Sequence, residues 1–152
     1  MVDWGREEYM HHLLSGENTA LILPKQVPDK ESAGAYLTKN IAGHKTCSAY
    51  NINNIFPLYL YPKTNGQQTI EESTERTPNL NQEIVKEISE KLGLNFTNEK
   101  EDTKGAFAPI DILDYIYAVL HSPTYRSAYK EFLKIDFPRV PYPKDTKTFW
   151  EL

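Results

Sequence analysis

The apolar positions of the chain follow a helical period most clearly between residues 109 and 134. From Pro109 to His121, apolar side chains recur three and four positions apart, which places them on one wide face of a helix. They are Ile112, Leu113, Ile116, Tyr117, Val119 and Leu120. Ser122-Pro123 then interrupts the pattern, and serine as a cap with proline at the first helical position predicts a second helix over Pro123–Lys134. Its inner face would consist of Tyr125, Tyr129, Phe132 and Leu133.

The segment after this helix contains prolines at every second or third position. Pro138, Pro141 and Pro143 exclude both a helix and a central strand, because proline lacks the backbone donor that each requires. We expect residues 135–143 to form an extended, polyproline-like strap beside the two helices.

Two apolar runs nearer the N-terminus predict strands. Thr19–Pro24 reads as a buried strand that ends at proline, and Ile55–Tyr61 (IFPLYLY) reads as a second strand. Pro57 belongs on an edge or at a bulge of that strand. Before and between them we expect a short helix over Arg6–Leu14 with Tyr9, Leu13 and Met10 inward, and a strand or short helix between residues 35 and 48.

The middle of the chain predicts one further helix, from Gln82 to Leu92. Asn79 or Asn81 can cap it, and Gly93 can end it in the left-handed conformation. The apolar positions that we expect to face inward are Ile84, Val85, Ile88 and Leu92.

These elements predict an α+β fold in which a small, mainly antiparallel sheet from the N-terminal part packs against a C-terminal helical subdomain. We divide the chain into residues 1–65 (the sheet), 66–107 (an acidic connection with one helix) and 108–152 (the helices and the strap). Phe149, Trp150 and Leu152 resemble one turn of a helix separated from its continuation, so we interpret the chain as a fragment of a longer protein, truncated at its C-terminus.

Two stretches carry a resemblance to a known family. Residues 111–143 (DILDYIYAVLHSPTYRSAYKEFLKIDFPRVPYP) resemble the closing signature of the C-terminal specificity region of single-chain type ISP restriction–modification enzymes. Residues 54–62 (NIFPLYLYP) resemble a second signature of that region, in the expected order. The two stretches cover about a third of the chain. The match is specific because it combines an unusual aromatic and proline pattern over more than thirty consecutive positions.

The resemblance implies a role within a large bacterial enzyme. Type ISP enzymes join a nuclease, a helicase-like motor, an adenine-specific DNA methyltransferase and a target recognition domain. The implied partners are therefore double-stranded DNA and the methyltransferase and motor domains of the same parent chain, in a bacterial defence system. The implied task of this chain is non-catalytic recognition of a DNA sequence.

The charge distribution bears on that implication. The net charge is −4, and residues 66–104 hold nine acidic and five basic side chains while the flanking segments are neutral. An acidic protein binds DNA only where its basic groups gather on one face. We therefore expect weak or undetectable duplex binding by the isolated chain at physiological salt.

The residues most suited to contact DNA precede the IFPLYLY run. We call residues 50–54 (YNINN) the amide-rich turn. Asparagine can form two hydrogen bonds with an adenine edge, so this turn is a candidate reader of bases. The alternative is that its asparagines serve only the geometry of a turn. Arg126 and Lys130, four positions apart on the second helix, are candidates for phosphate contact or simply a solvated face. The complete candidate set is Lys45, Ser48, Tyr50, Asn51, Asn53, Asn54, Arg126 and Lys130.

Catalytic, metal and cofactor motifs are absent from the sequence. There is no phosphate-binding loop, no glycine-rich cofactor turn and no Asn-Pro-Pro-Tyr sequence, so we expect no catalytic residue, no metal and no cofactor. The adjacent His11 and His12 lack further ligands at metal-binding spacing and are interpreted as surface residues. A single Cys47 fits a reducing cytoplasm, and no apolar run is long enough to cross a membrane.

The sequence is also compatible with two other functions. The domain could be a structural coupling module that packs between methyltransferase and motor without reading bases, which the acidic balance favours. A small hydrolase that uses His121 or Cys47 is the third hypothesis, and it lacks an orienting third group.

Overall fold

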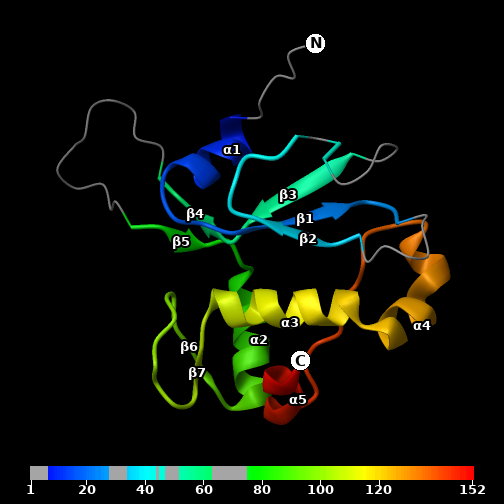
Figure 1. The fold of residues 1–152 in the computed structure, drawn as a ribbon. Coiled ribbons are helices and arrows are strands. Elements are labelled where there is room, and N and C mark those ends of the chain that lie inside the picture. Colours follow the sequence, from blue (N-terminus) through cyan, green and yellow to red (C-terminus); the bar gives the residue numbers. More distant parts are fainter. Residues whose placement is uncertain (1–6, 28–33, 44, 47–51, 63–74) are drawn as a thin grey trace, which may run out of the picture.

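The computed structural model describes residues 7–27, 34–43, 45–46, 52–62 and 75–152, and Figure 1 shows their arrangement. The described elements, in chain order, are α1 (Glu7–Leu14), β1 (Ala20–Pro24), β2 (Tyr36–Thr38), β3 (Asn53–Pro57), β4 (Tyr59–Leu60), β5 (Thr77–Pro78), α2 (Gln82–Leu92), β6 (Asn95–Phe96), β7 (Ala106–Phe107), α3 (Pro109–His121), α4 (Pro123–Leu133) and α5 (Thr146–Glu151). The predicted α+β class is confirmed, with a sheet in the N-terminal part and helices in the C-terminal part.

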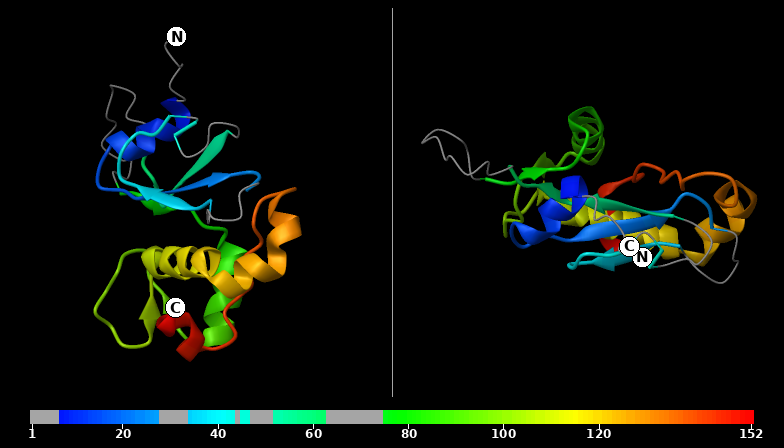
Figure 2. Two further views of the ribbon diagram at one scale, coloured as in Figure 1. Left: turned by 45° about the vertical axis from the view of Figure 1, so that its right-hand side comes forward. Right: turned by 90° about the horizontal axis from the view of Figure 1, so that it is seen from above.

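The N-terminal sheet has three antiparallel strands in the order β2-β1-β3. Leu21 of the central strand pairs with Leu37 on one side and with Phe56 on the other, so these three side chains share a face. Two smaller pairs follow: β4 with β5 is antiparallel, and β6 with β7 is parallel. Figure 2 shows the sheet lying between α1 and the C-terminal helices.

The predicted strand over Ile55–Tyr61 is divided in two at Leu58. The Leu58 amide donates to the Thr19 carbonyl at 2.8 Å, and the Leu58 carbonyl accepts from the Asn79 amide at 2.9 Å. The amide bond continues the pairing of β3 with β1 by one residue, whereas the carbonyl bonds outside the three-stranded sheet, so β3 ends at Pro57 and β4 pairs elsewhere. Pro57 stands at the end of an edge strand, as predicted.

Helix α2 has the predicted bounds and caps. The Asn81 side chain accepts from the amides of Glu83 and Ile84 at 2.8 and 3.2 Å, and Gly93 ends the helix at a φ of 65°. Val85, Ile88 and Leu92 are buried as expected. The prediction for Ile84 is wrong, since its side chain is 42% exposed.

Helices α3 and α4 also begin where the sequence predicts. The Asp111 carboxylate accepts from the Ala108 amide at 2.8 Å, which is the half of a capping box that needs no cap side chain. Alanine has no side-chain acceptor for the amides of the first turn. The Ser122 hydroxyl accepts from the Tyr125 amide at 3.4 Å. The prediction for Tyr129 is wrong: its ring lies 4.8 Å from that of Tyr125 but is 45% exposed.

The proline-rich segment forms neither helix nor strand from residue 137 to residue 143, as expected. Two buried tyrosines of the helices hold it in place. The Tyr125 hydroxyl donates to the Arg139 carbonyl at 3.0 Å, and the Tyr115 hydroxyl donates to the Pro141 carbonyl at 3.1 Å. Pro143 is fully buried. We call residues 135–143 the strap.

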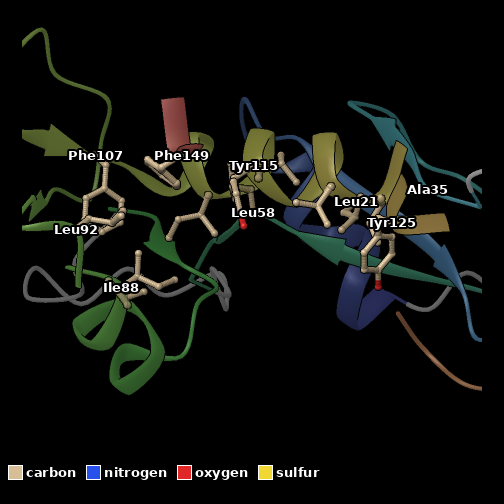
Figure 3. Close-up of a cluster of buried hydrophobic side chains, with 14 of the residues drawn as sticks. Leu21, Ala35, Leu58, Ile88, Leu92, Phe107, Tyr115, Tyr125 and Phe149 are labelled. Carbon is tan, nitrogen blue, oxygen red and sulfur yellow. The ribbon is translucent and has the colours of Figure 1, made fainter. Parts of the chain in front are cut away.

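A cluster of buried apolar side chains joins the sheet to the helices (Figure 3). Leu21 and Leu58 contribute from the sheet half, and Val85, Ile88 and Leu92 contribute from α2. An aromatic group fills the end of the cluster near α5, where the Phe107 ring packs edge to face with the rings of Phe96 and Phe149.

Helix α1 is attached to the sheet half through its two histidines. His12 Nδ1 accepts from the Tyr61 amide at 2.9 Å, and His11 Nε2 donates to the Tyr61 carbonyl at 3.3 Å. Both histidines are partly buried, so the interpretation of them as solvated surface residues is wrong. They satisfy the backbone just beyond β4 instead.

A second polar junction is centred on Arg76. Its guanidinium donates to both oxygens of Glu99 at 2.7 and 2.6 Å and lies over the Tyr59 ring, 3.9 Å from the centroid. It also donates to the Glu17 carbonyl. Burial, together with the nearby Glu99 carboxylate, raises the pKa of Tyr59 to about 12. Arg76 thereby connects the turn after α1, strand β4 and the loop after β6.

Candidate functional site

The two asparagines that open β3 lie on opposite faces of the sheet. Asn53 pairs with Pro24 and is only 6% exposed, whereas Asn54 pairs with Leu23 and is partly exposed. Successive side chains of a strand alternate between faces, so strand pairing that begins at Asn53 separates the two amides. The structure does not bring them to one groove as expected, and of the two only Asn54 is partly exposed.

The structure describes only one of the other four candidate residues in and before the amide-rich turn. Lys45 is exposed, before the start of β3. Ser48, Tyr50 and Asn51 lie outside the described residues. The expectation for these three positions therefore stays a prediction.

Arg126 and Lys130 lie on α4, and the end of this helix is joined to the end of β1. The Val27 amide donates to the Leu133 carbonyl at 2.9 Å, and the Gln26 side chain donates to the Ile135 carbonyl at 3.3 Å. The Lys25 ammonium lies 3.9 Å from the Asp136 carboxylate. Since Pro24 pairs with Asn53, the C-terminal ends of β1 and α4 and the start of β3 meet at one end of the molecule (Figure 1).

We call this region the β1–α4 end and define it by residues 25–27, 52–54 and 123–136. It carries four basic side chains, Lys25, Arg126, Lys130 and Lys134. It carries two acidic ones, Glu131 and Asp136, and each forms an ion pair with a lysine of the same region. The region therefore has a surplus of two positive charges in a protein whose net charge is −4.

The segment that leads to β3 has an unusual charge pattern of its own. Residues 32–70 contain Lys39, Lys45 and Lys63 and no aspartate or glutamate. A surface that meets a polyanion excludes carboxylates, because like charges brought together in a poorly solvated contact repel. The sequence alone contains this pattern, but a charge count over residues 1–65 hides it. The acidic side chains of the first 31 positions make that longer segment neutral.

The opposite charge is concentrated in residues 79–121, which we call the α2–α3 region. It holds eight acidic and four basic side chains. Asp114 on α3 illustrates the local field, since burial and the neighbouring Asp111 carboxylate raise its pKa. The excess acid of the protein is therefore located away from the β1–α4 end.

The described residues offer no support for the hydrolase hypothesis. His121 Nε2 donates to the Ala35 carbonyl at 3.1 Å, and its ring stacks on Tyr117 with centroids 4.2 Å apart, so the side chain joins α3 to the start of β2. Cys47 lies outside the described residues. Within the described residues, no three histidine, cysteine, aspartate or glutamate side chains are grouped so as to hold a metal ion. None of the described helices combines the length and apolarity that a membrane span requires.

Comparison with known proteins gives one match. A family model described as the type ISP C-terminal specificity domain matches residues 1–152, the whole chain. Searches among curated proteins and among solved structures each gave no significant match. A specificity domain is non-catalytic and has a target recognition role in restriction–modification, which gives no support to the coupling alternative. The chain therefore belongs to the family of type ISP C-terminal specificity domains.

Proposed function

We propose that this domain reads the target sequence of double-stranded DNA with its β1–α4 end, as the specificity part of an enzyme that also carries an adenine-specific DNA methyltransferase. The observation that carries the proposal is the positive surplus of this end in an acidic protein, at the place where the candidate residues of β3 and α4 meet. Phosphate contacts would fix the register of the domain, and side chains of the sheet half would contact base edges in the major groove.

The roles within the candidate set differ according to burial. Arg126 and Lys130 on α4 suit phosphate contact because they carry positive charge at this end, and Lys45 suits it because it is positively charged and exposed. Asn54 suits base contact, and Ser48, Tyr50 and Asn51 lie in or just before the same turn in the sequence. Asn53 is buried, so we assign it to the folding of β3 and not to the DNA contact.

The helices and the strap would hold the reading surface against the rest of the parent enzyme. The bonds of Val27 and Gln26 to the end of α4, and the tethered strap, make this end a rigid unit. In this proposal residues 1–65 carry the reader, residues 66–107 the acidic connection and residues 108–152 the mount that faces the methyltransferase and motor domains. The parent enzyme would act in the cytoplasm in bacterial defence.

Charge reversal tests the DNA contact directly. We expect Lys130→Glu and Lys45→Glu each to weaken binding of the chain to a mixed-sequence duplex, measured by fluorescence anisotropy at low salt. Each removed phosphate contact should also reduce the slope of log K against log salt by about 0.9. Lys91→Glu in the α2–α3 region is the matched control, because it changes the net charge by the same amount at an exposed helical position.

The control separates a local contact from a general effect of charge. Equal losses for Lys130→Glu and Lys91→Glu would show that only the net charge matters, and would refute the assignment of the surface. Absence of duplex binding by the unchanged chain at low salt would contradict the proposal as a whole.

A further inference from the structure

Large apolar side chains are exposed beside the positive charges of the β1–α4 end. Ile135, at the start of the strap, is 67% exposed, Ile52, next to β3, is 56% exposed, and Phe56 of β3 is 44% exposed. Exposing large apolar groups to water costs free energy of solvation unless a partner covers them.

Printed contacts bring the segments that carry these side chains together. The Phe56 ring meets the ring of Phe137 in the strap edge to face, with centroids 6.3 Å apart. The Gln26 side chain, just after β1, donates to the Ile135 carbonyl at 3.3 Å. Ile52 directly precedes Asn53, which pairs with Pro24 at the end of β1. We call Ile52, Asn54, Phe56 and Ile135 the β3–strap strip.

Asn54 adds a polar group to the strip. It lies on the same face of β3 as Phe56, since the two are two residues apart in a strand. Its amide donates one long hydrogen bond, 3.4 Å, to the Leu23 carbonyl. A bond of that length is weak, so a ligand can replace it at little cost.

The chemistry of the strip matches one base pair. In the major groove, adenine presents an acceptor (N7) and a donor (the N6 amino group), which suit an asparagine amide, and thymine presents the only methyl group, which suits aliphatic side chains. The positive surplus of the β1–α4 end and the absence of carboxylates over residues 32–70 favour a polyanion over a protein as the occupant. We propose that the β3–strap strip reads an A·T base pair, with Asn54 on adenine and Ile52 and Ile135 on the thymine methyl group. This proposal rests on the proposed function and assigns the base pair that the surface prefers.

Three duplexes that differ by single atoms or groups test it. The first is an alternating adenine–thymine duplex, the second replaces every thymine by uracil and so lacks the methyl group, and the third replaces every adenine by 7-deaza-adenine and so lacks N7. We expect the unchanged chain to bind the uracil duplex about fourfold more weakly, which corresponds to about 0.8 kcal/mol for one methyl group removed from water. The 7-deaza duplex should bind about fivefold more weakly, as for the loss of one hydrogen bond.

Variants assign each preference to its side chain. The double variant Ile52→Ala, Ile135→Ala should lose the preference for thymine over uracil and keep the preference for adenine over 7-deaza-adenine. Asn54→Ala should show the reverse pattern. Ile84→Ala, which truncates an isoleucine of comparable exposure in the α2–α3 region, should keep both preferences. The ratio of two affinities for one variant is insensitive to a partial loss of folded protein.

The outcomes separate this proposal from the proposed function. The chain could bind all three duplexes equally and still depend on Lys130 for binding. That result would refute the strip as a reader of bases and assign it to a protein partner, while the proposed DNA contact would stand. Preferences that persist unchanged in the strip variants would also refute it. Failure of the unchanged chain to bind any of the three at low salt would contradict both proposals.

Discussion

The β1–α4 end and the α2–α3 region differ in charge and in how they use apolar side chains. The α2–α3 region carries the acidic excess and buries its aromatic rings, with Phe107 only 1% exposed. The β1–α4 end carries a positive surplus and leaves Ile52 and Ile135 more than half exposed. The first arrangement serves folding, because it removes apolar surface from water. In the proposed function the second leaves surface for DNA, so stability and recognition would depend on different parts of one small domain.

The largest effect that tests this comparison is a truncation in the aromatic cluster. Phe107→Ala should lower the free energy of unfolding by about 3–5 kcal/mol, because it removes a fully buried ring that contacts Phe96 and Phe149. Phe56→Ala, which truncates the partly exposed phenylalanine of β3, should cost roughly 1 kcal/mol. Urea denaturation followed by circular dichroism measures both values. Similar losses for the two variants would show that the β1–α4 end is part of the folding core.

Substitution of two glycines with positive φ should have stability effects of intermediate size. Gly34, at a φ of 67°, precedes β2, and an added Cβ would lie 2.4 Å from Cγ2 of Val27, the residue that bonds to α4. Gly93, at a φ of 65°, ends α2, and an added Cβ would meet no atom within 4 Å.

Alanine would be strained by the positive φ at both positions, but only at position 34 would its Cβ also clash with Val27. Gly93→Ala should cost about 1 kcal/mol, the strain of a left-handed residue with a side chain. Gly34→Ala should cost roughly 2–3 kcal/mol, because Val27 must also move. Thermal unfolding of both variants in one buffer tests the difference, and a smaller loss for Gly34→Ala than for Gly93→Ala would mean that Val27 is loosely held.

The smallest effect concerns the polar junction at Arg76. The hydrogen bonds from Arg76 hold the pKa of Glu99 below its usual value, so the ionised form is favoured in the folded protein. The stabilisation is therefore present above the pKa of the unfolded chain and is lost as the pH falls through the lower folded pKa. With the Glu99 side chain 52% exposed, we expect only a few tenths of a kcal/mol. Arg76→Gln should remove this part of the acid dependence, and melting temperatures at neutral pH and at about pH 3 measure it.

The helix boundaries could be predicted because their determinants are local. Asn81, Gly93, Pro109 and Ser122 each act on backbone groups within a few residues, so the sequence alone indicates where α2, α3 and α4 begin or end. Which face of each helix is buried depends on more distant packing. Ile84 and Tyr129 fit the apolar period and are nevertheless 42% and 45% exposed, so the period alone does not indicate how fully a position is covered.

The strands were harder to predict, since their partners are distant in sequence. Leu58 interrupts the IFPLYLY run because its backbone bonds to Thr19 and Asn79, which no local pattern indicates. The same non-local pairing begins β3 at Asn53 and places its amide on the opposite face from that of Asn54. The register of the strand therefore determines which asparagine is accessible. The positive β1–α4 end likewise forms from segments about 100 positions apart, and the role of the candidate set in DNA binding stays a prediction.

The tyrosine tethers of the strap have a consequence for how this family can vary. Prolines offer carbonyl oxygens but no amide donors, so Tyr115 and Tyr125 attach the strap at two backbone carbonyls, those of Pro141 and Arg139. A substitution at either of these two positions would leave the accepting carbonyl in place, whereas insertion or deletion of one residue would displace everything beyond it by about 3 Å, the rise per residue of an extended proline-rich chain. Natural variation at the tether points must therefore preserve the length of the strap more strictly than the side chains.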